Sequence, residues 1–338
     1  MRTLLLGPQR FHLNATAALR SLATDGPVVT INSGWEERED ATEELDVALD
    51  HRAHHLRLFH RLTDVLAKDD RFAAAAMRFR DRHDELQAVY RLRITNTLAG
   101  LYAVQRRLPP RTRDLGLPAI SLRSAGDQGP GGGLLDESPL KAAIEDTIGG
   151  ARHIDTWYLD RLAAMGVELA EVGGIASSDV INWHRSQVAD ALAEAAVVVL
   201  TGGDVASLQQ TLRLFDVQIS PQTPVIAWSA GAMALGSPVV LFHDFGPDGA
   251  TEPEVFDRGL GRLPHLVALP HARTRLRLDD HVRCSVLAHR FADARCLTLD
   301  DGAWIEFDEH GQLRTEAGVL GLDGTIAVQA PHTGGVGG

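Results

Sequence analysis

Residues 227–232, with the sequence Ala-Trp-Ser-Ala-Gly-Ala, place Ser229 directly after the apolar run 224–228. Such a run is typical of a buried strand, and the small residues that follow favour a sharp turn into a helix. A serine on a strand-to-helix turn holds its hydroxyl above the edge of the sheet, where small neighbours let a substrate approach. The N–H of Ala230 would face a developing oxyanion. Ser229 is therefore a candidate nucleophile; the alternative is a serine that caps an ordinary helix.

A glycine-rich turn, Thr-Gly-Gly-Asp at residues 201–204, ends the preceding apolar run 196–200. Ligands of open α/β sheets bind at the carboxyl ends of the strands, so this turn is expected beside Ser229. Gly203 could then offer a second N–H to an oxyanion. The alternatives are a plain βα turn or a phosphate cradle. The sequence contains no G-x-G-x-x-G and no G-K-[ST] pattern, so it does not indicate a nucleotide site.

A nucleophilic serine needs a base, and the chain has 15 histidines. His271 follows the predicted strand 266–269, again at a strand end, and His243 competes with it. For an acid that orients the base, the turn Asp-Asp-Gly at 300–302 lies between two strand-like runs; a lone histidine or a turn aspartate is more often structural. Four histidines between residues 51 and 60 lack the H-E-x-x-H pattern and are interpreted as a solvated face, so no metal site is predicted.

These residues must be positioned by an α/β core. Strand-like runs at 3–6 and 27–32 flank a helical pattern, and the α/β rhythm resumes after Gly166 with a short predicted strand at 167–169. Between residues 36 and 113, charges alternate with Ala, Leu and Phe at spacings of three and four, which indicates long amphipathic helices. Residues 115–133 are rich in Pro, Ser and Gly and predict a linker.

The expected organisation is therefore a core formed by residues 1–35 and 152–330, a helical insertion and linker at 36–151, and a disordered tail at 331–338. The predicted fold class is a three-layer α/β sandwich with a mostly parallel sheet. The insertion leaves the core where the second strand ends, at the edge expected to hold the site. It could form a lid over a small substrate or an arm that forms a homodimer.

Composition narrows the class of protein further. The chain has 338 residues, a net charge of −12 and two cysteines, Cys284 and Cys296. The acidic charge argues against a general nucleic-acid surface, and so few cysteines fit a reduced cytoplasmic protein rather than a disulfide scaffold. No apolar run approaches the roughly 20 residues of a membrane helix, so no membrane partner is expected.

Taken together, the motifs resemble the dipeptidase E and cyanophycinase family of serine peptidases, whose fold is like that of class I glutamine amidotransferases. The resemblance rests on the turn 201–204, the elbow 228–232, the lead-in 259–264 (Gly-Leu-Gly-Arg-Leu-Pro) and Pro-His at 270–271. Cyanophycinase-like members continue with H-F-x-x-R-x-R, and this chain has Arg275 and Arg277 in register. The resemblance covers roughly residues 1–35 and 152–330.

The resemblance implies roles residue by residue. Ser229 would be the nucleophile and His271 the general base. Asp301, followed by Gly302 and an aromatic strand, would be the third member of the triad, with Asp244 as the second choice. Gly203 and Ala230 would form the oxyanion hole; further substrate contacts would come from Gly202, Asp204, Arg275 and Arg277. The chain departs from the family pattern at Ala227 (for Gly), Thr201 (for Gly) and Ala272 (for an aromatic residue).

The implied activity is hydrolysis of a small peptide, at an aspartyl or isoaspartyl bond, through an acyl-enzyme on Ser229 and without a metal or organic cofactor. Arg275 and Arg277 could bind a substrate carboxylate or could simply be solvated. The alternative function is that of a catalytically inactive or non-peptidase protein of the same fold whose helical insertion binds a partner. A glutaminase is not expected, because that chemistry uses a cysteine where this elbow has serine.

Overall fold

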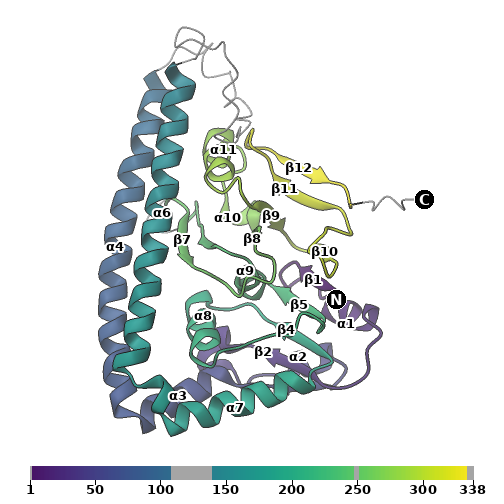
Figure 1. Cartoon of the computed structure of the whole chain (residues 1–338). Helices are drawn as coiled ribbons and strands as arrows, with labels where there is room; N and C mark the ends of the chain where they lie inside the picture. The colour runs from purple at the N-terminus through teal and green to yellow at the C-terminus, as the bar shows by residue number, and fades with distance from the viewer. Residues whose placement is uncertain (1, 108–138, 247–250, 333–338) are drawn as a thin grey trace, which may run out of the picture.

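The computed structural model describes residues 2–107, 139–246 and 251–332. A six-stranded sheet in the order β10-β1-β5-β4-β2-β3 forms its centre (Figure 1). Five of these strands run parallel and β10 pairs antiparallel with β1. The strands are β1 (Thr3–Leu6), β2 (Val28–Ile31), β3 (Ala53–His55), β4 (Val197–Leu200), β5 (Val225–Trp228) and β10 (Trp304–Phe307). The prediction of a mostly parallel sheet in a mixed α/β protein is confirmed.

Both faces of this sheet are covered by helices. Successive residues of a strand point to opposite faces, so Val198 and Leu200 pack in one apolar cluster while Val197 and Val199 pack in another. The first face is covered by α3 (Leu58–Lys68), α7 (Asp179–Glu194), α8 (Val205–Leu214) and α9 (Ala230–Leu235). The second face is covered by α1 (Ala15–Ser21) and α2 (Glu43–Ala48). Burial on both sides explains the continuous β-branched run in β4.

A smaller sheet lies beside the first, in the order β12-β11-β9-β8, with β8 and β9 parallel. Its strands are β8 (Leu266–Pro270), β9 (Arg295–Leu299), β11 (Ala317–Leu320) and β12 (Ile326–Gln329). An antiparallel pair, β6 (Val239–Leu241) and β7 (Glu254–Asp257), packs near it. The short helix α10 (Ala272–Arg275) follows β8, and α11 (His281–Arg290) packs on the apolar side of this sheet.

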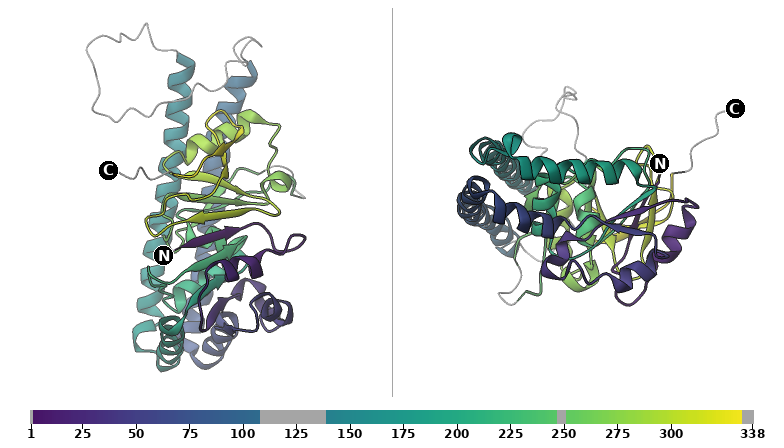
Figure 2. Two further views of the ribbon diagram at one scale, coloured as in Figure 1. Left: turned by 90° about the vertical axis from the view of Figure 1, so that its right-hand side faces the viewer. Right: turned by 90° about the horizontal axis from the view of Figure 1, so that it is seen from below.

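Two long helices, α4 (Asp70–Arg107) and α6 (Pro139–Val172), lie side by side along the flank of both sheets (Figures 1 and 2). Their shared contact contains Tyr90, Ile94, Ile148 and Tyr158, all buried. The same cluster continues into β7, β8 and α11, so the helix pair is packed against the core over part of its length. The predicted long amphipathic helices are present. Among the described residues, no helix is both long and apolar enough to cross a membrane.

The segment predicted to be a helical insertion and linker, residues 36–151, also contains a strand, β3. Val29 of β2 pairs with His54, so this segment supplies the edge strand of the central sheet. Only three residues long, β3 has no apolar run that would mark it in the sequence. It is held by polar contacts instead: His55 bonds the Thr30 hydroxyl at 2.6 Å and Asp46 at 3.0 Å.

The strand predicted at residues 167–169 is also wrong, because these residues belong to the last turns of α6. A three-residue apolar segment is compatible with either a strand or a helix face, and the neighbouring pattern of α6 decides between them. The predicted linker at 115–133 and residues 333–338 of the predicted tail lie outside the described residues.

Candidate active site

Ser229 occupies the turn between β5 and α9 with φ +50° and ψ −121°. A non-glycine residue in such a conformation costs on the order of 1–3 kcal/mol, and such residues cluster at functional sites. The Ser229 side chain makes no capping hydrogen bond to α9. The alternative of an ordinary helix cap is therefore not what the geometry shows.

Two glycines that lie close to the Ser229 turn permit it: Gly231 in α9 and Gly202 at the end of β4. A Cβ on Gly231 would lie 2.4 Å from the carbonyl oxygen of Leu200, a distance that would force the backbone apart. A Cβ on Gly202 would lie 3.0 Å from the Ser229 Cβ and 3.4 Å from its Oγ. The elbow is thus packed directly against the end of β4, and the predicted proximity of the turn 201–204 to Ser229 is present in the structure.

Two backbone donors near Ser229 are unused. Gly203 has φ +122°, and a Cβ there would lie 2.2 Å from the carbonyl oxygen of Gly34. That carbonyl accepts a hydrogen bond from the N–H of Asp204 at 2.7 Å, which fixes the turn. Within the described residues, neither the N–H of Gly203 nor that of Ala230 donates a hydrogen bond. Free N–H groups of this kind are what an oxyanion requires.

A cavity of about 600 Å³ brings together most of the predicted site residues. From the central sheet come Gly203, Asp204, Ser229 and Ala230; from the end of β8 come His271 and Arg275. The predicted competitor His243 also lines this cavity. Gly202 supports Ser229 by contact. Arg277 is not part of the cavity wall: its guanidinium lies 5.7 Å from the centre of the Phe245 ring.

His271 caps α10 with φ +58° and ψ +35°. Its N–H donates to the carbonyl of Leu299 at 3.0 Å, and its own carbonyl accepts from the N–H of Arg275 at 2.9 Å. Burial lowers the pKa of His271, and the charge of Arg275 lowers it further, while Asp300 and Asp301 oppose this shift. The lowered pKa favours the neutral imidazole, which is the form that a general base requires. In the described part of the chain, no hydrogen bond joins His271 to the Ser229 hydroxyl.

The two predicted acids are both engaged elsewhere. Asp301, on an exposed turn, pairs with His12 and accepts from the His12 N–H at 3.3 Å. Asp244 is buried and accepts from the N–H of Arg277 at 2.8 Å and from Nε of Arg283 at 2.9 Å. Neither acid bonds the His271 ring among the described contacts.

Asp300 is a third candidate acid that sequence reasoning passed over in favour of its neighbour. It raises the pKa of His271 more than Asp301 does. It also accepts a hydrogen bond from the N–H of Arg273 at 2.9 Å, close to His271 along the chain. In the sequence, the only indication of a role for Asp300 was its position next to Asp301 in the turn 300–302.

Four polar residues of the cavity wall were missed: Arg91, Thr251, Glu252 and Glu254. Arg91 comes from the middle of α4, and its Nε lies 2.8 Å from both carboxylate oxygens of Glu254 in β7. Glu252 pairs with Arg283 at 3.1 Å. The sequence does not indicate that Arg91 and Glu254 meet, because they belong to elements that are far apart in the chain and come together only in the packed fold.

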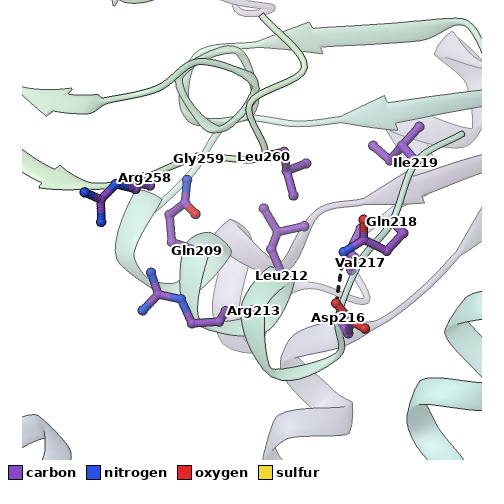
Figure 3. Close-up of a pocket in the computed structure, with 10 residues that line it drawn as sticks. All are labelled: Gln209, Leu212, Arg213, Asp216, Val217, Gln218, Ile219, Arg258, Gly259 and Leu260. Carbon is purple, nitrogen blue, oxygen red and sulfur yellow. Dashed lines mark hydrogen bonds between the residues drawn. The ribbon is translucent and has the colours of Figure 1, made fainter. Parts of the chain in front are cut away.

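A second cavity, of about 330 Å³, lies beside the carboxyl-terminal half of α8 (Figure 3). Its charged side chains are partnered: Asp216 with Gln218 at 2.9 Å, Arg258 with Asp160 at 3.0 Å, and Arg213 with Asp257. Its wall contains no serine, cysteine or histidine, so it offers neither a nucleophile nor a base. Among the described residues, no group of three or more His, Cys, Asp or Glu side chains could hold a metal ion.

Comparison with known proteins gives little family information. No protein-family model matches the chain, and no curated protein sequence matches it. A solved structure, described as the crystal structure of a peptidase from an acI-B1 Actinobacterium, is similar at 17% identity. The match covers 58% of this chain and 76% of that chain, with a TM-score of 0.31. The assignment of function therefore depends on the residues of this chain.

Proposed function

We propose that this protein is a serine hydrolase that cleaves a small peptide through an acyl-enzyme on Ser229. The observation that carries the proposal is the strained Ser229 elbow, which shares one cavity with His271 and with the free N–H groups of Gly203 and Ala230. Strained non-glycine residues cluster at functional sites, and here the strained residue lies next to unused backbone donors.

In the proposed reaction, the neutral His271 removes the proton of the Ser229 hydroxyl as its oxygen attacks the peptide carbonyl. Gly203 and Ala230 donate hydrogen bonds to the oxyanion of the tetrahedral intermediate. The imidazolium then protonates the leaving amine, and water, activated by His271, releases the acyl group. Asp300 or Asp301 stabilises the imidazolium. Asp301 could take this role if it moved away from His12.

The finer assignment follows the motif resemblance. We infer a class I glutamine amidotransferase-like fold, a relationship to dipeptidase E and cyanophycinase, and an aspartyl or isoaspartyl substrate. Supporting this, the guanidinium of Arg275 lines the cavity without an ion-pair partner among the described residues. A substrate carboxylate would supply that partner.

A serine-directed fluorophosphonate probe tests the nucleophile. We expect covalent labelling of the wild-type protein, mapped by mass spectrometry to the peptide that contains Ser229, and no labelling of Ser229→Ala. Ser207→Ala is the matched control, because Ser207 lies on the neighbouring helix α8 and its hydroxyl donates to Glu36. Hydrolysis of a dipeptide library with α- and β-aspartyl members then identifies the bond that is cleaved.

One observation favours the alternative of a non-catalytic binding protein. Ser229, His271 and an aspartate do not form a continuous hydrogen-bonded triad in the described residues. If short peptides bind in the cavity while the probe leaves Ser229 unlabelled, the binding function replaces the enzymatic one.

A further inference from the structure

The middle of helix α4 is fixed to the wall of the Ser229 cavity by a buried polar network. The hydroxyl of Tyr90 accepts a hydrogen bond from the N–H of Val255 in β7 at 2.7 Å and donates to Asp155 of α6 at 2.8 Å. Arg290 of α11 donates to the Tyr90 hydroxyl at 2.7 Å and to Asp155, and also to the carbonyl of Pro253. Satisfied buried networks of this kind hold their members in one arrangement.

The next residue along α4 is Arg91, which reaches the cavity from this fixed position. Its Nε is held by the carboxylate of Glu254 at 2.8 Å. Its two Nη groups donate to no partner within the described residues, and its side chain is half exposed at the cavity wall. A guanidinium held at one edge and free at the other presents a forked pair of donors to a ligand.

We propose that Arg91 is a substrate-binding residue that holds the carboxyl-terminal carboxylate of a short peptide. This inference rests on the proposed function and adds the substrate class to it. The helix pair then acts as a fixed wall of the active site that supplies the subsite for the end of the substrate chain.

The charges of the cavity favour a carboxylate over an ammonium group. Each anionic side chain of the wall already has a donor: Asp204 accepts from the Ser207 N–H at 2.8 Å, Glu252 pairs with Arg283, and Glu254 pairs with Arg91. Besides the N–H groups of Gly203 and Ala230, the donors of this wall that have no partner among the described residues include the cationic Nη groups of Arg91 and the guanidinium of Arg275.

The position of Arg91 favours a chain end over an internal side chain. Arg275 belongs to the turn of His271, where its N–H donates to the His271 carbonyl at 2.9 Å, so the two residues lie together in the cavity wall. Arg91 instead comes from α4, and the buried network at Tyr90 prevents that helix from moving aside. A peptide that extends from Ser229 to this wall would place its terminal carboxylate at the free edge of Arg91.

The test measures binding without turnover. Aspartylalanine, its carboxamide and its N-acetyl derivative are titrated by calorimetry into full-length Ser229→Ala and into Ser229→Ala/Arg91→Gln. We expect the carboxamide to bind Ser229→Ala about tenfold more weakly than the free acid, the value of one charge-assisted hydrogen bond. In the double variant, the free acid should weaken by the same factor, and the carboxamide should be unchanged.

Two further variants make the result specific to Arg91. Arg82→Gln removes an arginine of the same helix whose one ion-pair partner among the described residues is the exposed Glu85, so it should leave all three affinities unchanged. Arg91→Lys keeps the charge and should retain part of the preference for the free acid. Because Arg91 is half exposed, we expect thermal unfolding of the Arg91 variants to stay close to that of the parent.

Several results would overturn the proposal. These are equal binding of acid and carboxamide to Ser229→Ala, no binding of the free acid at millimolar concentration, an equal loss for both ligands in the double variant, or a loss caused only by N-acetylation. The fluorophosphonate result is independent. An unlabelled Ser229 with an intact Arg91-dependent preference would reject the enzyme and keep the subsite. A labelled Ser229 without that preference would reject the subsite alone.

Discussion

The proposed nucleophile and the candidate acids of the turn 300–302 are held in different ways. Around Ser229, backbone atoms meet with no space to spare: a single methyl group on Gly231 would collide with the carbonyl of Leu200. The backbone of the turn that contains Asp300 and Asp301 is also closely packed, since a Cβ on Gly7 would lie 2.1 Å from the carbonyl oxygen of Asp300. Its two carboxylates, however, are held by exposed contacts to Arg273 and His12. The difference therefore lies in the side chains: the geometry of the elbow places the Ser229 hydroxyl, whereas exposed polar contacts place the two carboxylates.

The largest effect should come from Ser229→Ala. Loss of the nucleophile should lower kcat by about 10⁴- to 10⁶-fold, as for a residue that acts as part of a unit. The fold should be unaffected, because the Ser229 hydroxyl makes no capping bond. Steady-state hydrolysis of the best library substrate measures this change. Retention of more than a tenth of the activity would place the nucleophile elsewhere.

Gly231→Ala tests how tightly the elbow is fixed. The added Cβ would lie 2.4 Å from a backbone oxygen, so the elbow must shift. We expect about a 100-fold loss of kcat, since small misplacements of a nucleophile are costly, and a loss of about 1–3 kcal/mol in the free energy of unfolding. Denaturant unfolding and kinetics on the same preparation measure both.

Gly166→Ala is the matched control for that variant. Gly166 lies inside α6, and a Cβ there meets nothing within 4 Å. Alanine is favoured over glycine by up to about 1 kcal/mol in a helix, so this variant should be slightly more stable and fully active. Equal behaviour of the two alanine variants would contradict the tight packing of the elbow.

Substitutions of the three candidate acids should affect the stability and the activity of the protein differently. Asp244→Asn leaves Arg283 without one of its buried carboxylates, so we expect about 3 kcal/mol lower stability and little change in kcat. Asp300→Asn and Asp301→Asn should leave the melting temperature nearly unchanged. Substitution of the one aspartate that stabilises the imidazolium should lower kcat about tenfold. A large loss of kcat in soluble, folded Asp244→Asn would instead make Asp244 the third member of the triad.

The smallest expected effect is a shift in the pH profile. The base works when neutral, so kcat/KM should fall as the pH drops through the pKa of His271, which is lowered below its ordinary value by burial and by Arg275. Removing the Arg275 charge in Arg275→Gln should raise that pKa and move the acidic limb of the profile to higher pH. Asp301→Asn removes an opposing charge and should move the limb to lower pH. Limbs that stay in place in both variants would show that His271 is not the group that titrates.

The parts of the site that the sequence predicted are those defined by local chain geometry. Ser229 and the turn 201–204 follow buried strands directly, and His271 follows β8, so the period and composition of short segments were enough to find them. Arg91 and Glu254 were not predictable, since they belong to different elements and meet only because Tyr90, Asp155 and Arg290 pack together.

For the fold, the continuous apolar strands β4 and β5 and the long helices were predictable from their patterns. The edge strand β3 was not, because its pairing depends on polar contacts of His55 with Thr30 and Asp46. The same limit applies to Asp301, whose partner His12 lies on a loop near the amino terminus. Polar partners far apart in the chain carry no periodic signal.

The anchoring of α4 at Tyr90 and Arg91 lies near the middle of the helix, which continues from Arg91 to Arg107, about 24 Å at 1.5 Å per residue. This second part also reaches the cavity, because the Tyr102 hydroxyl donates to Glu252 of the cavity wall at 3.3 Å. A force or a ligand that acts on the far part of α4 therefore has two routes to the cavity wall, the buried network at Tyr90 and the bond between Tyr102 and Glu252.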